Sequence, residues 1–234
     1  MPLIKRPPVE QRGANDLVYA LVIKDDATEY TTGEVKHLIS VAEISKATTS
    51  SNEAHYYDNM PAVNINSEGA DEISITGSLI DLETLAEITG KSYDPSTGVF
   101  SDVGATPPYV ALGYKSQNTD LSEYYAWRFK GTFSIPDDIA KTKDDGTEGT
   151  GTQLTYTGIY TTHAFTKGKA IVGEEGAVTY ETAPSKAIKV NVSEGKIDAS
   201  TFFEEVTTPD TITPKTQMSI AKAAKATATT PNKE

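Results

Sequence analysis

Apolar and polar residues alternate from Glu123 to Ile135, and this pattern constrains the fold more than any other part of the chain. A period of two places successive side chains on opposite faces of a β-strand, and a helix cannot produce it. A second apolar run, at 109–114, precedes it across a polar segment short enough to close an antiparallel hairpin. The pattern predicts a hairpin with one buried face, made of Tyr125, Trp127, Phe129, Gly131, Phe133 and Ile135.

Similar patterns place further elements along the chain. Apolar runs or clean alternation predict strands at 17–24, 72–79, 154–165 and 187–192. The polar residues 35–54 predict a long hairpin or an extended loop. Loops are expected at 25–33, 92–107 and 137–151.

One short helix is expected after residue 80. The side chain of Asp81 can accept hydrogen bonds from the free amides of a first helical turn, and Gly90 can adopt the left-handed conformation that closes a helix. A helix this short is marginal alone, so we expect it to pack against a sheet. The apolar residues of its packing face are Leu82, Leu85, Ala86 and Ile88.

Composition divides the chain into three parts. Residues 1–14 are rich in proline and lack periodicity, so they are expected to form an N-terminal arm. Residues 15–206 are expected to form one mainly-β domain. Residues 207–234 contain no aromatic residue and are dominated by Thr, Ala, Pro and Lys, which predicts a flexible C-terminal tail. The apolar segment 17–23 is too short for a membrane helix and is expected to be a strand rather than a secretion signal.

The charge balance argues against binding to nucleic acid. The chain has 33 acidic and 21 basic residues, a net charge of −12, and no cluster of Lys and Arg that could neutralise a phosphate backbone. The tail at 207–234 carries a net +2, so the remaining residues carry −14. The chain also lacks cysteine, which excludes disulfides, thiolate metal sites and a cysteine nucleophile.

No residue pattern points to catalysis, a cofactor or a metal. His37, His55 and His163 lie far apart in the sequence without partners at ligand spacing. Residues 144–148 superficially resemble a calcium loop, but the regular oxygen donors and the terminal glutamate are missing. Asp137 and Asp138 are neighbours that are expected to be hydrated turn formers, not an acid/base pair. We therefore expect a protein that is not an enzyme and that needs no cofactor.

Several segments, taken together in order, resemble a known family. They are the segment PYVALGYKSQNTDLSEYYAWRFKGTFSI at 108–135, HYYDNMPA at 55–62, the strand and helix of 72–90, and the Thr-rich strand at 154–165. This combination resembles the major tail tube proteins of long, non-contractile-tailed (siphovirus-type) bacteriophages. The likeness extends over roughly 15–205.

The resemblance implies a tail-tube-type β-sandwich or barrel with one flanking helix, extended loops and terminal arms. It also implies a structural virion protein, assembled in the cytoplasm of a bacterial host, whose hexameric rings stack into a tube. The implied partners are further copies of the chain, a tape-measure protein in the lumen, and tail terminator and distal tail proteins at the tube ends. DNA would pass through without specific binding, because an acidic wall repels a polyanion.

Two segments are candidates for ring-to-ring contact because they are extended and poor in core-forming residues: the arm 1–14 and the loop 46–54. Repulsion between acidic copies would be reduced by salt or by lysines such as those at 115, 130, 141 and 143. An alternative from a different class is a monomeric binding module, of the adhesin or carbohydrate-binding type, with its aromatic residues on an exposed face. The buried stripe predicted for 125–135 favours core packing over such a platform.

Overall fold

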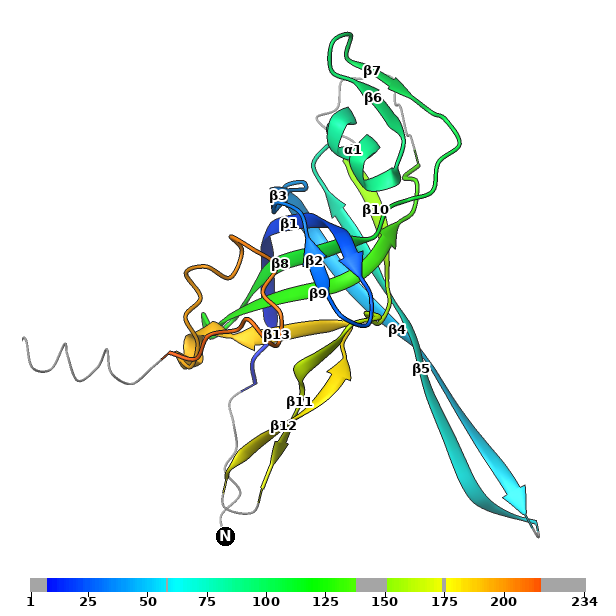
Figure 1. The fold of residues 1–234 in the computed structure, drawn as a ribbon, viewed down its shortest axis with the longest axis vertical. Coiled ribbons are helices and arrows are strands. Elements are labelled where there is room, and N and C mark those ends of the chain that lie inside the picture. Colours follow the sequence, from blue (N-terminus) through cyan, green and yellow to red (C-terminus); the bar gives the residue numbers. More distant parts are fainter. Residues whose placement is uncertain (1–7, 58, 138–150, 174–175, 216–234) are drawn as a thin grey trace, which may run out of the picture.

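The protein is mainly β with one short α-helix, as expected from the sequence (Figure 1). A computed structural model describes residues 8–57, 59–137, 151–173 and 176–215. No helix in these ranges is long and apolar enough to cross a membrane. The elements are β1 (Gln11–Asp25), β2 (Tyr30–Thr32), β3 (Lys36–His37), β4 (Val41–Tyr57), β5 (Met60–Gly77), α1 (Leu82–Thr89), β6 (Ser92–Asp94), β7 (Val99–Ser101), β8 (Val110–Asn118), β9 (Glu123–Phe133), β10 (Thr152–Gly158), β11 (Ala164–Val172), β12 (Val178–Pro184), β13 (Ala187–Asn191) and the 3-10 turn η1 (Val192–Glu194).

Nine strands form one curled antiparallel sheet. Its main path runs β2-β1-β8-β9-β10-β5-β4, with β3 added beside β1 and β13 beside β9. The sheet curls far enough for β1 to contact β4, so a barrel-like interior lies between its two halves (Figure 1). The hairpins β11–β12 and β6–β7 form two further, two-stranded sheets.

Apolar side chains gather in two clusters, one on each face of β8 and β9. The first lies inside the curl and includes Ile73, Leu112, Leu154 and Tyr156. The second lies on the opposite face and contains mainly aromatic side chains, which are covered by the chain near the C-terminal end of the described region. Its buried members are Ala20, Ala111, Trp127, Phe129, Phe165, Phe202 and Val206.

A β-bulge divides the stripe that the alternation predicted to be continuous. Val110 lies opposite Gly131 and Leu112 opposite Arg128, so two residues of β8 face three of β9. A bulge of one residue exchanges the two faces of a strand. Phe133 therefore joins the first cluster, and Ile135, beyond the end of β9, is 63% exposed.

Trp127 is fully buried, as predicted. Its indole Nε1–H donates to the carbonyl oxygen of Phe202 at 2.9 Å, which ties β9 to the covering segment. Gly113 lies opposite Trp127 on β8, and a Cβ there would approach the indole ring to 2.8 Å. Only glycine leaves room for this packing, because real Cβ atoms do not come so close.

The helix has the ends that the sequence predicted. The side chain of Asp81 accepts from the backbone N–H of Thr84 at 2.8 Å, and Gly90 adopts φ = 72°. Ile88 is completely buried in the first cluster, whereas Leu82 is about half exposed. Packing through its C-terminal half holds the helix against the sheet.

Two boundaries differ from the expected ones. Strand β1 begins at Gln11, within the residues expected to form the arm, because 11–14 pair with β8. The chain also stays with the fold beyond residue 206: Asp210 accepts hydrogen bonds from the backbone N–H groups of Thr166 and Lys167, and Pro214 bridges to Ile197. The other arm and tail residues, 1–7 and 216–234, lie outside the described ones.

Several strand assignments also differ, and the short strands β2, β6 and β7 lie in the expected loops 25–33 and 92–107. Residues 41–57 and 60–77 form one long hairpin, β4–β5, so the expected strand at 72–79 is only the end of a much longer element. The expected strand at 154–165 is divided between β10 and β11. The hairpin β11–β12 was not predicted, because most of its side chains are exposed and give no alternating pattern.

Replacing Trp127 by Ala should lower the free energy of unfolding by about 3 to 5 kcal/mol, because the change leaves a cavity and removes the hydrogen bond from the indole to the Phe202 carbonyl. Urea denaturation followed by circular dichroism measures the effect. Leu79→Ala, at a position 78% exposed, is the matched control and should stay within about 0.5 kcal/mol of the parent. A change below about 1 kcal/mol for the Trp127 variant would contradict its role in the core.

Candidate assembly surface

The hairpin β4–β5 projects far beyond the body of the molecule (Figure 1). Its distal part, residues 49–57 and 60–69, is called the ribbon below. Within the ribbon, every side chain whose burial the structure describes is exposed, and the two strands pair with each other along its whole length. An isolated two-stranded ribbon is at best marginally stable in water, because neither face is covered.

One face of the ribbon carries four exposed apolar side chains, next to Glu53 and His55. His55 lies opposite Val63 and Glu53 opposite Ile65, and near the tip Tyr57 lies opposite Met60. Residues directly opposite each other share a face, as do alternate residues of one strand. Tyr57, Met60, Val63 and Ile65 therefore share one face, where they are between 50% and 68% exposed.

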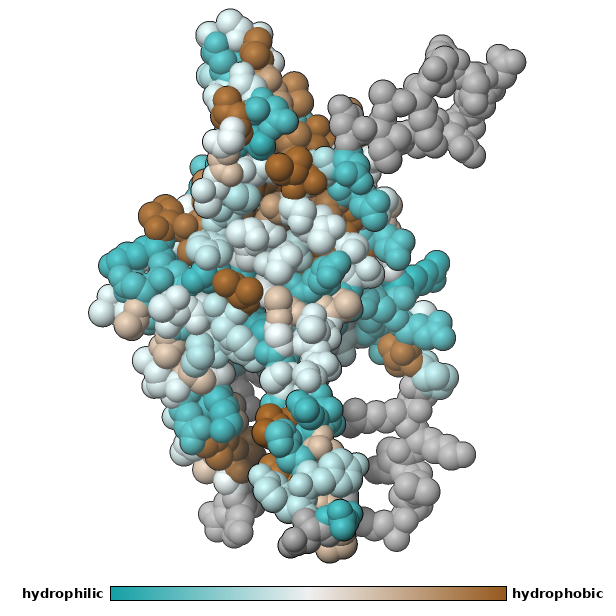
Figure 2. Space-filling model, turned by 90° about the vertical axis from the view of Figure 1, so that its right-hand side faces the viewer, coloured by the Kyte–Doolittle hydropathy of each residue, from teal (hydrophilic) through white to brown (hydrophobic). Residues whose placement is uncertain are grey.

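The other face of the ribbon is mainly polar. It carries the pairs Asn52 with Asn66 and Ala54 with Asn64, and Tyr56 near the tip. The sequence Val63-Asn64-Ile65-Asn66 is thus the alternation of a strand with one covered face, although no residue in the described part of the chain covers it. Figure 2 views the molecule from the side on which the ribbon projects. It shows apolar side chains exposed at several places on that side of the molecule.

A second hairpin, β11–β12, projects from the body in a similar way (Figure 1). Ile171, Val172, Val178 and Tyr180 are exposed on it, Val172 to 69%. Exposed apolar groups on extended, two-stranded segments make both hairpins candidate contact surfaces.

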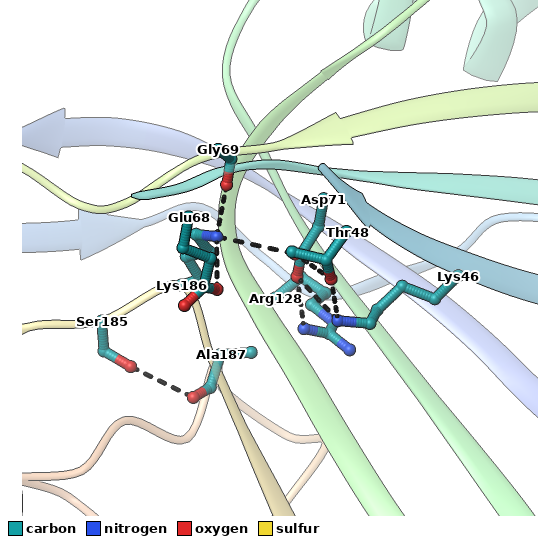
Figure 3. Close-up of polar contacts among 9 residues, drawn as sticks. All are labelled: Lys46, Thr48, Glu68, Gly69, Asp71, Arg128, Ser185, Lys186 and Ala187. Atoms are coloured by element: carbon teal, nitrogen blue, oxygen red, sulfur yellow. Dashed lines mark hydrogen bonds and ion pairs between the residues drawn. The ribbon is translucent and has the colours of Figure 1, made fainter. Parts of the chain in front are cut away.

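A cluster of charges joins the ribbon to the body (Figure 3). Its centre is Asp71 of β5, whose side chain is only 3% exposed. Arg128 of β9 reaches one carboxylate oxygen at 2.9 Å and Lys46 of β4 the same oxygen at 3.4 Å. Thr48 donates to the other oxygen at 2.9 Å. The carboxylate thus links both strands of the hairpin to the central strand of the sheet.

These contacts keep Asp71 ionised. Burial by itself would raise the pKa of the carboxyl group. The hydrogen bond from Thr48 and the positive charges of Lys46, Arg128 and Lys186 outweigh burial, so the net shift of the pKa is downward. A buried carboxylate with three cations around it is strongly held, and removal of the carboxylate would leave the cations unpaired.

Lys186 connects the same cluster to β13. Its ammonium group donates to the carboxylate of Glu68 at 2.7 Å and to the carbonyl oxygen of Gly69 at 2.5 Å, and lies 3.6 Å from Asp71. The lysine side chain is 7% exposed. Burial lowers its pKa, but the hydrogen bond to Glu68 and the charge of Asp71 reverse this, and the net shift is upward.

The residues examined in the sequence for metal binding or catalysis are not brought together. His37 and His55 are exposed and His163 is half-buried, each on a separate element. Among the described residues, no group of three or more His, Asp or Glu side chains could hold a metal ion. Residues 138–150, which include Asp138 and the loop compared with a calcium site, lie outside those residues.

The lysines expected to offset acidic repulsion have local partners in this chain. Lys130 pairs with Asp25 at 2.5 Å, and both side chains are less than 10% exposed. Asp25 also accepts from the backbone N–H groups of Thr162 and His163, which fixes the connection after β10. Lys115 pairs with Asp16 at 2.6 Å. Residues 141 and 143 lie outside the described part of the chain.

Sequence reasoning found half of the ribbon. Residues 46–54 were named as a contact segment within an expected long hairpin or extended loop, and they lie in β4 of the hairpin. The apolar residues of β5 were missed, although the alternation at 63–66 was visible as a signal. The charge cluster could not be found from local patterns, because its members come from positions as far apart as 46 and 186.

No protein-family model matches the chain, and no curated protein matches its sequence.

Asp71→Asn should destabilise the protein by about 3 to 5 kcal/mol at pH 7, because it leaves buried cations without their counter-charge. The folded-state pKa of Asp71 lies below its ordinary value of 3.8. Its contribution is therefore complete above that value and is lost as the pH falls through the folded pKa. The difference between variant and parent should therefore persist at pH values above 3.8 and shrink as the pH falls below that value, through the lowered pKa of Asp71.

Urea unfolding at several pH values measures this difference. Glu181→Gln, which breaks the exposed pair between Lys169 and Glu181, is the control and should change the stability by less than about 1 kcal/mol at pH 7. A gap between Asp71→Asn and the parent that stays constant down to the acid limit would contradict the assignment of the ionised carboxylate.

Proposed function

We propose that the protein is a structural subunit that assembles with copies of itself into a tube, as the resemblance to major tail tube proteins implies. The observation that carries the proposal is the one-sided ribbon, with Tyr57, Met60, Val63 and Ile65 exposed on one face. Such a face is stable in water only when another layer covers it. We take this layer to be a neighbouring copy of the same chain, because copies of the chain are always present where a subunit assembles with itself.

The geometry of the ribbon favours an open or ring-like assembly. A projecting arm contacts a different part of the neighbouring subunit, so the contact is heterologous. Heterologous contacts close into rings or continue as filaments, depending on the rotation between subunits. Hexameric rings stacked into a phage tail tube, around a tape-measure protein and later DNA, are the form proposed here. Terminator and distal tail proteins would close the ends of the tube.

The aromatic residues favour this proposal over a monomeric binding module. That alternative needs the aromatic side chains of β9 on an exposed face, but Trp127, Phe129 and Phe133 are buried. No aromatic platform is therefore available on β9. Sedimentation and negative-stain electron microscopy distinguish the two. A purified chain that remains monomeric at every concentration would favour the binding module.

Removing the apolar character of the ribbon should abolish assembly without unfolding the subunit. In the double variant Val63→Ser, Ile65→Ser, both changed side chains are exposed in the single chain, so its stability should change by no more than about 1 kcal/mol. Tubes and rings should disappear in negative stain. The control Asn64→Ser, Asn66→Ser changes the opposite face of the same strand and should assemble. Tubes of normal length from the first variant would contradict the proposed interface.

Assembly should also respond to salt in a defined direction. Each copy carries a net charge of −12, so close packing is opposed by repulsion that salt screens over a Debye length of about 10 Å at 0.1 M. Tube yield, measured by pelleting, should rise between about 0.02 and 0.3 M NaCl. A yield that falls over this range would indicate an interface held mainly by intermolecular ion pairs, contrary to the apolar contact proposed.

A further inference from the structure

The base of the ribbon also contains a β-bulge. Thr48 lies opposite Asp71 and Ser50 opposite Glu68, so two residues of β4 face three of β5. The additional residue of β5 lies at Gly69 or Ala70. A bulge of this kind shifts all side chains beyond it to the other face of the strand.

This shift decides which side of the ribbon is apolar. Below the bulge, Asp71, Ile73 and Ile75 face the body and are buried. Without the bulge, Val63 and Ile65 would continue on that same face, because all these positions are odd-numbered. With it, they lie on the opposite face, together with Tyr57 and Met60. The bulge therefore turns the apolar side chains away from the side that continues into the molecule's own core.

Lys186 holds the bulge in place. Its ammonium group donates to the carbonyl oxygen of Gly69, inside the bulge, and to the carboxylate of Glu68 next to it (Figure 3). The backbone of Lys186 is itself fixed to the central strand, because its carbonyl oxygen accepts from the N–H of Phe129 at 2.9 Å. The body thus sets the position of the Lys186 side chain, and the pairing at the base of the ribbon follows from that position.

A competing register exists in which β5 pairs regularly beyond Asp71. In that slipped register, Gly69 would lie opposite Ser50, and Asn52 would lie opposite Ser67 in place of Asn66. The Gly69 carbonyl would then belong to a regular ladder, and the buried ammonium of Lys186 would lose an acceptor. A buried charge without its hydrogen-bond partner is costly, so Lys186 disfavours the slipped register.

We propose that Lys186 is a positioning residue that selects the bulged register of β5 and thereby the face on which the ribbon presents its apolar side chains to a neighbouring copy. The selection of the register concerns the single chain. The presentation of the apolar face to a neighbouring copy rests on the proposed function.

The register can be measured directly, because the chain contains no cysteine. The pair Asn52→Cys, Asn66→Cys is directly opposed only in the bulged register, and the pair Asn52→Cys, Ser67→Cys only in the slipped one. Opposed residues in antiparallel strands lie within the Cα separation that a disulfide spans. Neither pair changes the apolar residues of the ribbon. Air oxidation and peptide mass spectrometry give the yield of each disulfide.

With Lys186 present, the first pair should form its disulfide efficiently and the second should not. In the Lys186→Met background, the ratio of slipped to bulged disulfide should rise about tenfold, which corresponds to about 1.4 kcal/mol. Lys189→Met, three residues further along the chain on β13, is the control: this lysine is exposed and lies over the ring of Tyr124, and the ratio should not change. If Lys186→Met does not fold, Lys186→Gln, which keeps a neutral donor, serves in its place.

Deletion of Ala70 gives a rescue test that a merely stabilising lysine would not pass. Without the additional residue, regular pairing restores the contact between Asn52 and Asn66, so Lys186 is no longer needed to select it. The Lys186→Met chain with Ala70 deleted should therefore recover the bulged-type disulfide. An unchanged disulfide ratio in Lys186→Met, or failure of this rescue, would overturn the inference.

Assembly supplies a separate readout. Lys186→Met should form few or no tubes, and the additional deletion of Ala70 should restore them. If the parent chain forms no tubes, the proposed function fails while the disulfide ratios still decide the role of Lys186. If the ratios change as expected but tubes form equally well in all variants, the link between register and assembly is refuted.

Discussion

Strand β9 gives one hydrogen-bonding edge to β8 and divides the other between β13 and β10. This division brings the two halves of the molecule together along one strand. Beside β13, the aromatic cluster forms under the covering segment near the C-terminal end of the described chain. Beside β10, the sheet continues into β5 and the curled interior. Arg128, between the two regions, reaches across to Asp71, so the direction of the projecting hairpin depends on the same strand.

The body and the ribbon differ in what stabilises them. The body contains two apolar clusters that bury its large side chains, and a chain of this length can form such a core without help. Apart from the contacts of Lys186 with Glu68 and Gly69 at its base, the described part of the ribbon is held mainly by its own ladder of hydrogen bonds, with most of its apolar groups on one side. In the proposed assembly, such a subunit would be stable before it associates. Association would then cover the ribbon without reorganising the core.

Local signals in the sequence predicted the elements whose physical cause is local. The helix was located from Asp81 and Gly90, which act within one turn, and the burial of Trp127 followed from its alternating neighbours. The bulges in β9 and β5 were not predictable, because the residue types of a strand do not show where one additional residue interrupts the regular pairing. Phe133 was therefore assigned to the wrong cluster. The segment 207–215 looked like a tail because Asp210 is held by amides that lie more than 40 positions earlier in the chain.

The same limit applies to the candidate surface. The apolar residues of the ribbon are visible in the sequence, but their common face depends on the partner of each residue, on the bulge at the base of the ribbon, and on a register shift between His55 and Tyr56 near its tip. The charge cluster at the base is visible only in three dimensions, because β4, β5, β9 and the residue before β13 each contribute to it. A sequence of this kind shows which residues are available for contact, while long-range pairing decides where they point.

Charged groups at the base of the ribbon contribute more to the orientation of the ribbon than to the stability of the protein. Buried ion pairs lose hydration that their attraction only partly offsets, and well-packed apolar residues often stabilise a protein equally well. Apolar side chains, however, would tolerate either register of β5, since they form contacts without fixed direction. The ammonium of Lys186 requires acceptors at defined places, and the Gly69 carbonyl occupies one of them in the bulged register. A surface whose function depends on which face is apolar gains more from such a directional contact than from additional apolar packing.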